Sequence, residues 1–424
     1  MAEFLKTGKS EKELQETSYK VQKAVSDIIK DIEENGDKAV RDLSVKFDKW
    51  SPESFLLTQE QIEKIISSVD ETVKNDIKFA QEQIRFFAEK QKESLHEIEV
   101  ENIPGATLGH KIIPVNSAGC YIPGGRYPMV ASAHMSILTA KVAGVKRIVA
   151  CTPPINGEIP AATVTAMYLA GADEIYILGG VQAMTAMAVG TETMTPVDMI
   201  VGPGNAFVAE AKRQLFGKVG IDLLAGPTET LVIADETADG EMIATDILGQ
   251  GEHGPTSPGA LITTSRKIVE DTLEEIERQL KILPTADVAR TSWEDNGTII
   301  LVDSLKEAVY EADKLAYEHV EVLTSDNDYF LNNLTNYGSL FLGPETNVAY
   351  GDKVIGTNHT LPTQKAAKYT GGLWVGKYLK TVTYQKITPQ ASVTIGEYAE
   401  RLTDLEGFKG HKAQATLRLN RYKK

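Results

Sequence analysis

The sequence predicts an α/β fold with two tandem parallel-sheet domains, a helical segment before them and a C-terminal arm after them. Three observations carry this prediction. From about residue 111, short apolar segments that end in turn residues alternate with helical patterns, and a second run of the same kind follows. Strands that alternate with helices form a parallel sheet covered on both faces. The length of 424 residues also exceeds what one hydrophobic core usually supports.

The first hundred residues are predicted to be helical. Apolar residues recur there at the helical period of 3.6 residues, in two separate stripes. The first stripe is Val21, Val25, Ile28 and Ile32, and the second is Val73, Ile77, Ala80, Ile84 and Phe87. We expect both stripes to face a core.

Eight apolar segments are predicted as strands. They are RIVACTPP, EIYILGG, DMIVGPG and TLVIADE in the first run, and GALITTS, NGTIILVD, HVEVLT and GSLFLG in the second. Residues 160–170 and 204–214 are predicted as helices of the first run. In the second run a helix is predicted from Val269, Leu273, Ile276 and Leu280. The two runs resemble two Rossmann-like units, although no residue-level repeat proves a duplication.

The tail from about residue 377 has a different composition. It is rich in Lys, Thr and Tyr and ends in the basic, helix-like stretch HKAQATLRLNRYKK. The tail is too small to fold alone, so we expect it to pack on another domain or another subunit. A frayed tail is the alternative.

Composition and charge exclude several classes of protein. A hydrophobic content of 42% is far from the composition of disordered chains, and the net charge of -15 disfavours nucleic acid or an anionic membrane as partner. The start MAEFLKTGKSEKELQ lacks a secretory signal, and no apolar run is long enough to span a membrane. We therefore expect a cytoplasmic protein. The spacing of Cys120 and Cys151 predicts neither a disulfide framework nor a thiolate zinc site.

Glycine-rich strand exits are the first places to search for a ligand, because open parallel sheets bind ligands beyond the carboxyl ends of their strands. The segment VGPGNAFVAEAK would aim backbone N–H groups and a helix dipole at a phosphate. It lacks the complete G-x-G-x-x-G pattern, so a nucleotide loop and a structural turn are equally open. The segments AGCYIPGGR and LGGVQA, taken alone, favour structural turns.

Polar residues in the second half could bind a metal. Gln250 and His253 are three residues apart at the end of an amphipathic helix, so they project from nearly one face. Because thiolates are excluded, a zinc ion with nitrogen and oxygen ligands is the natural candidate. Asp352 lies beside a glycine and suits a ligand. The alternatives are a surface or capping histidine and a plain turn aspartate.

Glu318 and His319 are adjacent at the start of the segment HVEVLT. An imidazole can accept a proton near neutral pH, and a neighbouring carboxylate can polarise water. Taken alone, an exposed Glu-His pair without function is the commoner interpretation.

Taken together, the motifs resemble the histidinol dehydrogenase family from about residue 20 to the C-terminus. They occur in the order CYIPGGR, LGGVQA, VGPGN, AGPTE, QGEHGP, EHVEV, GDKVIGTNHTLPT and EGFKGHKAQATLR. Eight motifs in the family's order are far more specific than any one of them. The resemblance implies a homodimeric enzyme that uses zinc and NAD to oxidise a small primary alcohol, through an aldehyde, to a carboxylic acid.

The resemblance also implies roles for particular residues. It assigns the zinc ligands to Gln250, His253, Asp352 and His411, with His411 coming from the second subunit. It assigns catalysis to Glu318 and His319, and contacts with NAD to Tyr121, Gln182 and Asn205. The implied substrate contacts are Thr228, Gln250, His253, His319, Asp352, His359, Glu406 and His411. The family usually has Ser at the position of Thr228, which keeps the hydroxyl.

In the implied mechanism, zinc polarises the substrate, His319 takes the hydroxyl proton as hydride leaves for the nicotinamide, and Glu318 activates water for the second oxidation. A second step through a cysteine thiohemiacetal is not expected, because Cys151 lies in a Pro-rich turn and Cys120 lies beside the cofactor loop.

The resemblance also implies domain boundaries. Residues 1–20 are an N-terminal arm, and residues 21–120 with 229–376 form a first α/β domain that carries the zinc and catalytic residues. Residues 121–228 form a second, NAD-binding α/β domain. Residues 377–424 form a dimerisation arm that is swapped between the two subunits.

The substrate is open at this stage. Where histidinol enzymes typically read A-R-F-S-S-P-L, this chain reads AAKYTGGLWVGKYLKTVTYQ, which resembles the sulfopropanediol 3-dehydrogenases that oxidise 2,3-dihydroxypropane-1-sulfonate to sulfolactate. L-histidinol, oxidised to L-histidine, is the alternative, and Glu406 suits that cationic substrate. A buried carboxylate facing a sulfonate needs a counter-charge. Arg126, Lys365 and Lys368 are candidates for it.

Two hypotheses from other classes compete with an enzyme. A non-catalytic two-lobed ligand-binding protein would also contain tandem strand-helix units, but it would be expected to carry an export signal and would not need Glu318 and His319. A catalytically dead paralogue is a further alternative, although every predicted ligand and catalytic position holds a competent residue type.

Overall fold

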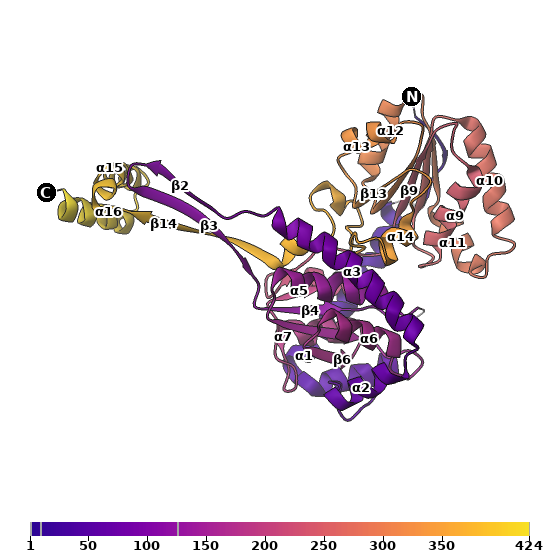
Figure 1. Cartoon of the computed structure of the whole chain (residues 1–424), viewed down its shortest axis with the longest axis horizontal. Coiled ribbons are helices and arrows are strands. Elements are labelled where there is room, and N and C mark those ends of the chain that lie inside the picture. Colours follow the sequence, from indigo (N-terminus) through magenta and orange to yellow (C-terminus); the bar gives the residue numbers. More distant parts are fainter. Residues whose placement is uncertain (1, 9–10, 125–126, 424) are drawn as a thin grey trace. The chain divides into compact units, whose positions relative to one another are not determined.

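The computed structural model describes residues 2–8, 11–124 and 127–423, and within the first helix it describes no side chains for residues 11–18. The chain forms two compact units. Unit 1 comprises residues 1–90 and 115–378, and unit 2 comprises residues 91–114 and 379–424. Figure 1 shows the elements of both units. Across the described residues, no helix is long and apolar enough to cross a membrane.

Unit 1 contains a six-stranded sheet in the order β1-β11-β10-β9-β12-β13. All neighbouring strands are parallel except β1, which runs antiparallel to β11 at the edge. Every residue of β9, β10 and β12 is buried, as expected for central strands covered on both faces. The strands are β1 (Glu3–Lys6), β9 (Thr230–Ala234), β10 (Gly259–Thr263), β11 (Thr298–Leu301), β12 (His319–Leu323) and β13 (Ser339–Leu342).

Helices cover both faces of this sheet. One core joins Val232 and Leu261 of the sheet to α9, α10 and α11, and the opposite core joins Leu231 and Ile262 to α12 and α13. Leu273, one of the predicted core positions, is instead 40% exposed. The helices are α9 (Gly240–Gly251), α10 (Arg266–Gln279), α11 (Ala286–Asn296), α12 (Leu305–Leu315), α13 (Asn327–Asn333) and α14 (Val348–Lys353), with short 3-10 turns at Ala366–Lys368 and Val375–Tyr378.

A second, five-stranded sheet of unit 1 is entirely parallel, in the order β6-β5-β4-β7-β8. Its strands are β4 (Ser117–Tyr121), β5 (Arg147–Thr152), β6 (Glu174–Ile177), β7 (Met199–Val201) and β8 (Gly220–Ile221). Its helices are α4 (Val130–Ala133), a π-helical turn at His134–Leu138, α5 (Thr139–Ala143), α6 (Ala161–Ala170), α7 (Gly180–Val189) and α8 (Ala206–Leu215). The two parallel sheets confirm the predicted α/β class, and all eight predicted strand segments form strands.

The N-terminal helices pack on the five-stranded sheet, a feature that the sequence patterns did not predict. Val25 and Ile32 of the first helix share one core with Val149 of β5 and with α7 and α8. Helix α2 packs on α6. Of the second predicted stripe, Val73 and Phe87 are exposed while its three middle residues are buried. The helices are α1 (Glu11–Asp48), α2 (Gln59–Ser68) and α3 (Glu71–Glu93).

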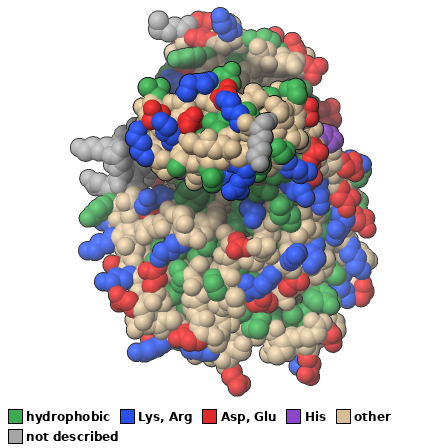
Figure 2. Space-filling model, turned by 90° about the vertical axis from the view of Figure 1, so that its left-hand side faces the viewer, with side chains coloured by type: hydrophobic (Ala, Val, Ile, Leu, Met, Phe, Trp, Pro, Cys, Tyr) green, Lys and Arg blue, Asp and Glu red, His purple; other side chains and the backbone are tan. Residues whose placement is uncertain are grey.

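Unit 2 is a three-stranded antiparallel sheet, in the order β14-β3-β2, followed by two helices. Its elements are β2 (Ile98–Ile103), β3 (Ala106–Pro114), β14 (Leu379–Ile387), α15 (Pro389–Leu405) and α16 (Lys409–Tyr422). The predicted C-terminal helix is confirmed as α16. Large apolar side chains stay exposed on the two helices and on the turn between them, at Tyr398, Leu402, Leu405, Phe408 and Leu417. On the face drawn in Figure 2, hydrophobic side chains reach the surface among interspersed basic and acidic ones.

Candidate active site

The predicted catalytic pair lies at the amino-terminal edge of the six-stranded sheet. His319 is the first residue of β12 and stands in register with Thr230 of β9 and Ser339 of β13. The general rule for open sheets directs attention to the opposite, carboxyl edge. Helix α9 runs back between β9 and β10, so Gln250 and His253 at its C-terminal end return to the amino edge.

Glu318 and His319 are both buried and are held by the neighbouring strand. Glu318 Oε2 accepts hydrogen bonds from Thr228 Oγ1 at 2.8 Å and from the Glu229 N–H at 3.1 Å. His319 Nδ1 lies 3.1 Å from the backbone oxygen of Glu229. Because a carbonyl oxygen can only accept, Nδ1 carries the proton in the neutral ring, and Nε2 is the basic nitrogen.

Asp352 completes this array. His319 Nε2 lies 3.4 Å from Asp352 Oδ1, while His319 Nδ1 lies 3.4 Å from Glu318 Oε2, so the imidazole stands between two carboxyl groups. Asp352 is on α14 and is 8% exposed. A buried imidazole between two carboxylates is stabilised in its protonated form.

The pKa values of the three groups follow from burial and from this arrangement. Burial alone would lower the pKa of His319, but Glu318 and Asp352 outweigh it and raise the pKa to about 9. Burial raises the pKa of Glu318 to about 7, although His319 and the bonds from Thr228 and Glu229 act in the opposite direction. Burial would also raise the pKa of Asp352, but His319 lowers it to about 2. Strongly shifted pKa values within one buried cluster are typical of acid-base sites.

Both ring nitrogens of His359, a predicted substrate contact, are hydrogen-bonded. Its Nδ1 lies 3.0 Å from the backbone oxygen of Asp352, and its Nε2 lies 2.9 Å from Ser132 Oγ. Nδ1 therefore donates to the carbonyl, and Ser132 donates to Nε2. Burial lowers the pKa of His359 to about 4, so the ring is neutral at physiological pH.

Three predicted zinc ligands belong to unit 1. Gln250 Oε1 is buried without a hydrogen-bond partner among the described residues, which is unusual for an amide oxygen and suits a metal ligand. His253 is partly exposed at the surface, but burial of its ring lowers its pKa more than the neighbouring Asp352 raises it. No three His, Cys, Asp or Glu side chains in the described part of the chain converge closely enough to hold a metal alone. A nitrogen or oxygen ligand from elsewhere would complete the set.

The remaining predicted residues on the C-terminal tail belong to unit 2. His411 lies in the first turn of α16, where its exposed ring stacks on Phe408 at 5.4 Å between centroids. Glu406 is the exposed C-cap residue of α15. His411 and Glu406 therefore belong to a different unit from the other predicted site residues.

The three predicted NAD contacts lie at the carboxyl edge of the five-stranded sheet. Tyr121 ends β4, and its hydroxyl oxygen accepts from the Gly180 N–H at 3.0 Å. Gln182, at the start of α7, donates to Asp48 Oδ2 at 3.0 Å. Asn205 caps α8 by accepting from the N–H groups of its first turn. The strand order reverses between β4 and β7, which is where open sheets bind dinucleotides.

A glycine at this reversal allows a close backbone approach. Gly202 follows β7 with φ of +121°, and a Cβ there would lie 2.2 Å from the Tyr121 carbonyl oxygen. The exit of β7 therefore needs glycine. The Gly202 N–H donates to Asp222 Oδ2 at 2.9 Å.

Other candidate groups are placed as follows. Lys365 and Lys368 lie on the exposed side of the 3-10 turn that follows Thr363, whereas Arg126 lies outside the described residues. Both cysteines are free and fully buried. Burial raises the pKa of Cys120 to about 12 and raises that of Cys151 as well, so both stay protonated thiols and poor nucleophiles.

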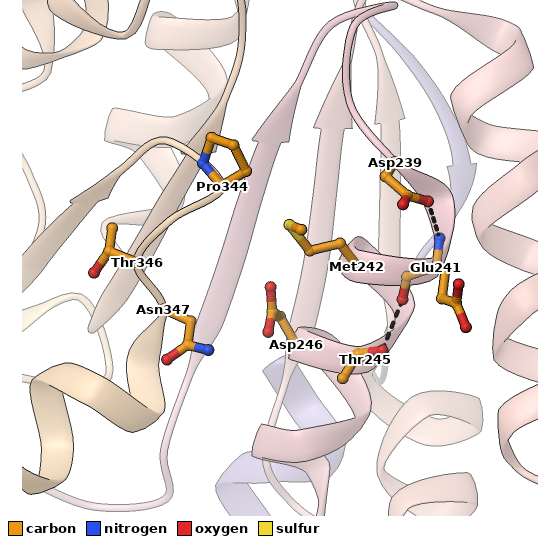
Figure 3. A pocket seen from close by; sticks show the side chains of 8 residues that line it. All are labelled: Asp239, Glu241, Met242, Thr245, Asp246, Pro344, Thr346 and Asn347. Carbon is orange, nitrogen blue, oxygen red and sulfur yellow. Dashed lines mark hydrogen bonds between the residues drawn. The ribbon is translucent and has the colours of Figure 1, made fainter.

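The pocket drawn in Figure 3 is at the opposite, carboxyl edge of the six-stranded sheet. It has a volume of about 310 Å³ and lies between the first turns of α9 and the segment after β13, with Met242 and Asp246 facing Thr346 and Asn347. None of the predicted site residues lines it. Beside Asp246 is the buried carboxyl of Glu321. Burial raises the pKa of both acids, and the charge of Asp246 raises the pKa of Glu321 further.

The sequence patterns did not predict two residues that form hydrogen bonds with the predicted site residues. Glu229 contacts both Glu318 and His319 through its backbone, and Ser132 contacts His359. Glu229 lies within the motif AGPTE, next to Thr228, which was the only signal for it. Ser132 had none, because its contact spans 227 residues of sequence.

Known proteins resemble this chain over nearly its whole length. A family model described as histidinol dehydrogenase matches residues 11–419. The chain is 73% identical to "Histidinol dehydrogenase homolog" of Shouchella clausii over 100% of both proteins. It is 46% identical to "Sulfopropanediol 3-dehydrogenase" of Ruegeria pomeroyi over 95% of this chain and 93% of that protein.

A solved structure matches the fold. The crystal structure of histidinol dehydrogenase from Elizabethkingia anophelis superposes with a TM-score of 0.89 at 34% identity, covering 95% of this chain and 93% of that one. The sequence matches and this likeness agree with each other. The chain belongs to the histidinol dehydrogenase family, a family of dehydrogenases that act on CH–OH groups and generally use NAD and zinc.

Proposed function

We propose that this protein oxidises a small primary alcohol to a carboxylic acid, through an aldehyde, with transfer of four electrons. The observation that carries the proposal is the buried array of Glu318, His319 and Asp352, in which one imidazole stands between two carboxyl groups. Such an array can take up and release protons near neutral pH. A non-catalytic ligand-binding protein would have no need of it.

The proposed metal site uses Gln250, His253 and Asp352, completed by His411 from the second subunit of a homodimer. The Gln250 side-chain oxygen, which has no hydrogen-bond partner in the described part of the chain, and the negative charge of Asp352 support it, because zinc accepts oxygen and nitrogen ligands. When bound, zinc would polarise the hydroxyl and carbonyl oxygens of the substrate. The exposed apolar side chains of α15 and α16 support a tail that packs on another subunit.

The chain's own residues would move the protons. His319 Nε2, in the neutral form of the ring, accepts the hydroxyl proton of the alcohol, since Nδ1 is committed to the Glu229 carbonyl. Glu318 and Asp352 raise the pKa of His319 to about 9, and Asp352 would raise it less once its charge is committed to zinc, so the neutral ring would then be more populated. Glu318 then accepts a proton from the water that adds to the aldehyde carbon, and the resulting hydrate is oxidised to the acid. A pKa of about 7 lets Glu318 both accept and release that proton. Thr228 and His359 would position the substrate.

The proposed NAD site is the carboxyl edge of the five-stranded sheet, with contacts from Tyr121, Gln182 and Asn205. The reversal of strand order and the close approach at Gly202 support it. When bound there, NAD would accept a hydride in each of the two oxidations. In this proposal the five-stranded sheet and its helices, α1 and α2 among them, form a Rossmann-like NAD-binding domain in tandem with a zinc and catalytic domain built on the six-stranded sheet. Residues 1–20 and the swapped residues 377–424 form its arms.

For the substrate we propose 2,3-dihydroxypropane-1-sulfonate, which would yield sulfolactate. Similarity to the sulfopropanediol enzyme over nearly the full chain and the segment around Lys365 and Lys368 support this choice. L-histidinol is the second candidate, favoured by Glu406, whose carboxylate suits a cationic substrate and would require a counter-charge next to a sulfonate.

The test is to supply each alcohol separately to the purified protein with zinc and NAD, and to follow NADH formation. We expect turnover of the sulfonate with two NADH formed per alcohol. Efficient turnover of L-histidinol instead would contradict the proposed substrate. Turnover of neither would contradict both candidates.

A further inference from the structure

Glu229 stands between the predicted catalytic pair and the segment that distinguishes this chain from histidinol enzymes. It is the residue just before β9, and its side chain is 7% exposed. Its N–H donates to Glu318 Oε2, and its carbonyl accepts from both the backbone N–H and the ring Nδ1 of His319, each at 3.1 Å. One backbone unit therefore orients both side chains.

The side chain of Glu229 points to a different partner. Its Oε1 accepts a hydrogen bond of 2.8 Å from the N–H of Gln364. Gln364 and Lys365 have φ of 54° and 66°, a left-handed conformation that is costly for residues with a Cβ. Such a turn persists only where its surroundings hold it.

Hydrogen bonds within the turn close it, among them those from the Ala366 N–H to the Thr363 oxygen at 3.0 Å and from the Lys368 N–H to the Lys365 oxygen at 3.2 Å. The residue before the turn is anchored by two more. Thr363 Oγ1 accepts from the Gly226 N–H at 2.8 Å, and the Thr363 N–H donates to the Leu224 oxygen at 3.3 Å. Both anchor the residue before the turn, whereas Glu229 anchors Gln364 inside it. Loss of the Glu229 carboxyl would leave the Gln364 N–H without this acceptor.

We propose that Glu229 is a positioning residue that fixes the substrate-specifying turn at Gln364–Lys368 against the catalytic pair. The inference rests on the proposed function, because it assigns substrate positioning to that turn. The backbone of Glu229 orients Glu318 and His319 whatever its side chain, so changes to the side chain act on substrate binding rather than on proton transfer. The side chain serves as a hydrogen-bond acceptor, a role that an amide oxygen can also fill.

The test compares Glu229→Ala with Glu229→Gln in the zinc-loaded enzyme, using whichever alcohol is oxidised. The Ala variant should raise KM about tenfold and change kcat less than about threefold, since one buried hydrogen bond is lost. The Gln variant should restore KM toward the wild-type value. The matched control is Glu311→Ala, which removes another buried glutamate, one that pairs with Lys314. An unchanged KM in Glu229→Ala, or a Gln variant as impaired as Ala, would overturn the proposal.

Hydrogen-deuterium exchange of the peptide that contains Gln364 provides a readout besides activity. Exchange at residues 360–368 should be faster in Glu229→Ala than in the wild type, and unchanged in Glu229→Gln and Glu311→Ala. Unchanged exchange in Glu229→Ala would overturn the contact itself. Failure of the wild type to oxidise either alcohol would instead contradict the proposed function, and exchange would still decide whether Glu229 holds the turn.

Discussion

Replacing Thr228 with valine tests whether Glu318 serves as the proton acceptor for water. The change removes the 2.8 Å hydrogen bond that the hydroxyl donates to Glu318 Oε2, and it keeps the shape of the side chain. A hydrogen bond to a charged group contributes about 1.5–3 kcal/mol, and each pKa unit corresponds to about 1.4 kcal/mol. The pKa of Glu318, about 7 in the wild type, should therefore rise by about 1–2 units in Thr228→Val.

The sign of the effect follows from the role of Glu318. A base works in its ionised form, so a higher pKa shifts the rising limb of the pH-rate profile to more alkaline pH. At pH 7 and saturating substrate, kcat should fall about 5- to 50-fold, and it should recover near pH 9 to 10. The assay is NADH formation across that pH range.

The matched control for this experiment is Thr230→Val. Thr230 is two residues away on β9, and its buried hydroxyl has no hydrogen-bond partner among the described residues. Its removal should leave the pH profile where it is. A profile that does not move in Thr228→Val, or one that moves equally in both variants, would refute the assigned role of Glu318.

Two further predictions concern metal binding and stability. His253→Ala should lose zinc on dialysis, as measured by metal analysis, whereas full zinc occupancy in that variant would remove His253 from the ligand set. Glu321→Gln should stabilise the protein increasingly as pH rises, because burial raises the folded-state pKa of Glu321 and the wild type loses stability as that acid ionises. At high pH the gain in the free energy of unfolding should approach about 1.4 kcal/mol for each unit by which the folded-state pKa of Glu321 exceeds its unfolded-state pKa. Urea unfolding at pH 6 and pH 9 measures it, with the exposed Glu236→Gln as control. A gain that does not depend on pH would contradict the raised pKa of Glu321.

Much of the fold could be predicted because the patterns are local. Runs such as TLVIADE and HVEVLT are apolar throughout and end at turn residues, so they indicate buried parallel strands, and the structure confirms them as β9 and β12. The packing of α1 on α7 and α8 could not be predicted, because an amphipathic stripe shows that a face is buried and not against what. The pairing of residues 91–114 with the tail in unit 2 is equally non-local.

The sequence motifs named residues that the structure brings together, but the contacts between them could not be predicted. The motifs pointed to Glu318, His319, Asp352 and His359, and the structure brings these four together. That the imidazole lies between two carboxyl groups depends on where β12 begins and on the position of α14, neither of which a motif contains. The part played by Glu229 follows from the register of β9 against β12, so no spacing rule could reveal it.

The most direct test of the account is complementation between two inactive variants. His319→Ala lacks the proposed base, and His411→Ala lacks the ligand that each subunit is proposed to give to its partner. In a mixed population half of the dimers are heterodimers, each with one intact site, so activity should return to about a quarter of the wild-type value. Each variant alone should be inactive. A mixture that stays inactive although heterodimers have formed would contradict a site shared between two subunits.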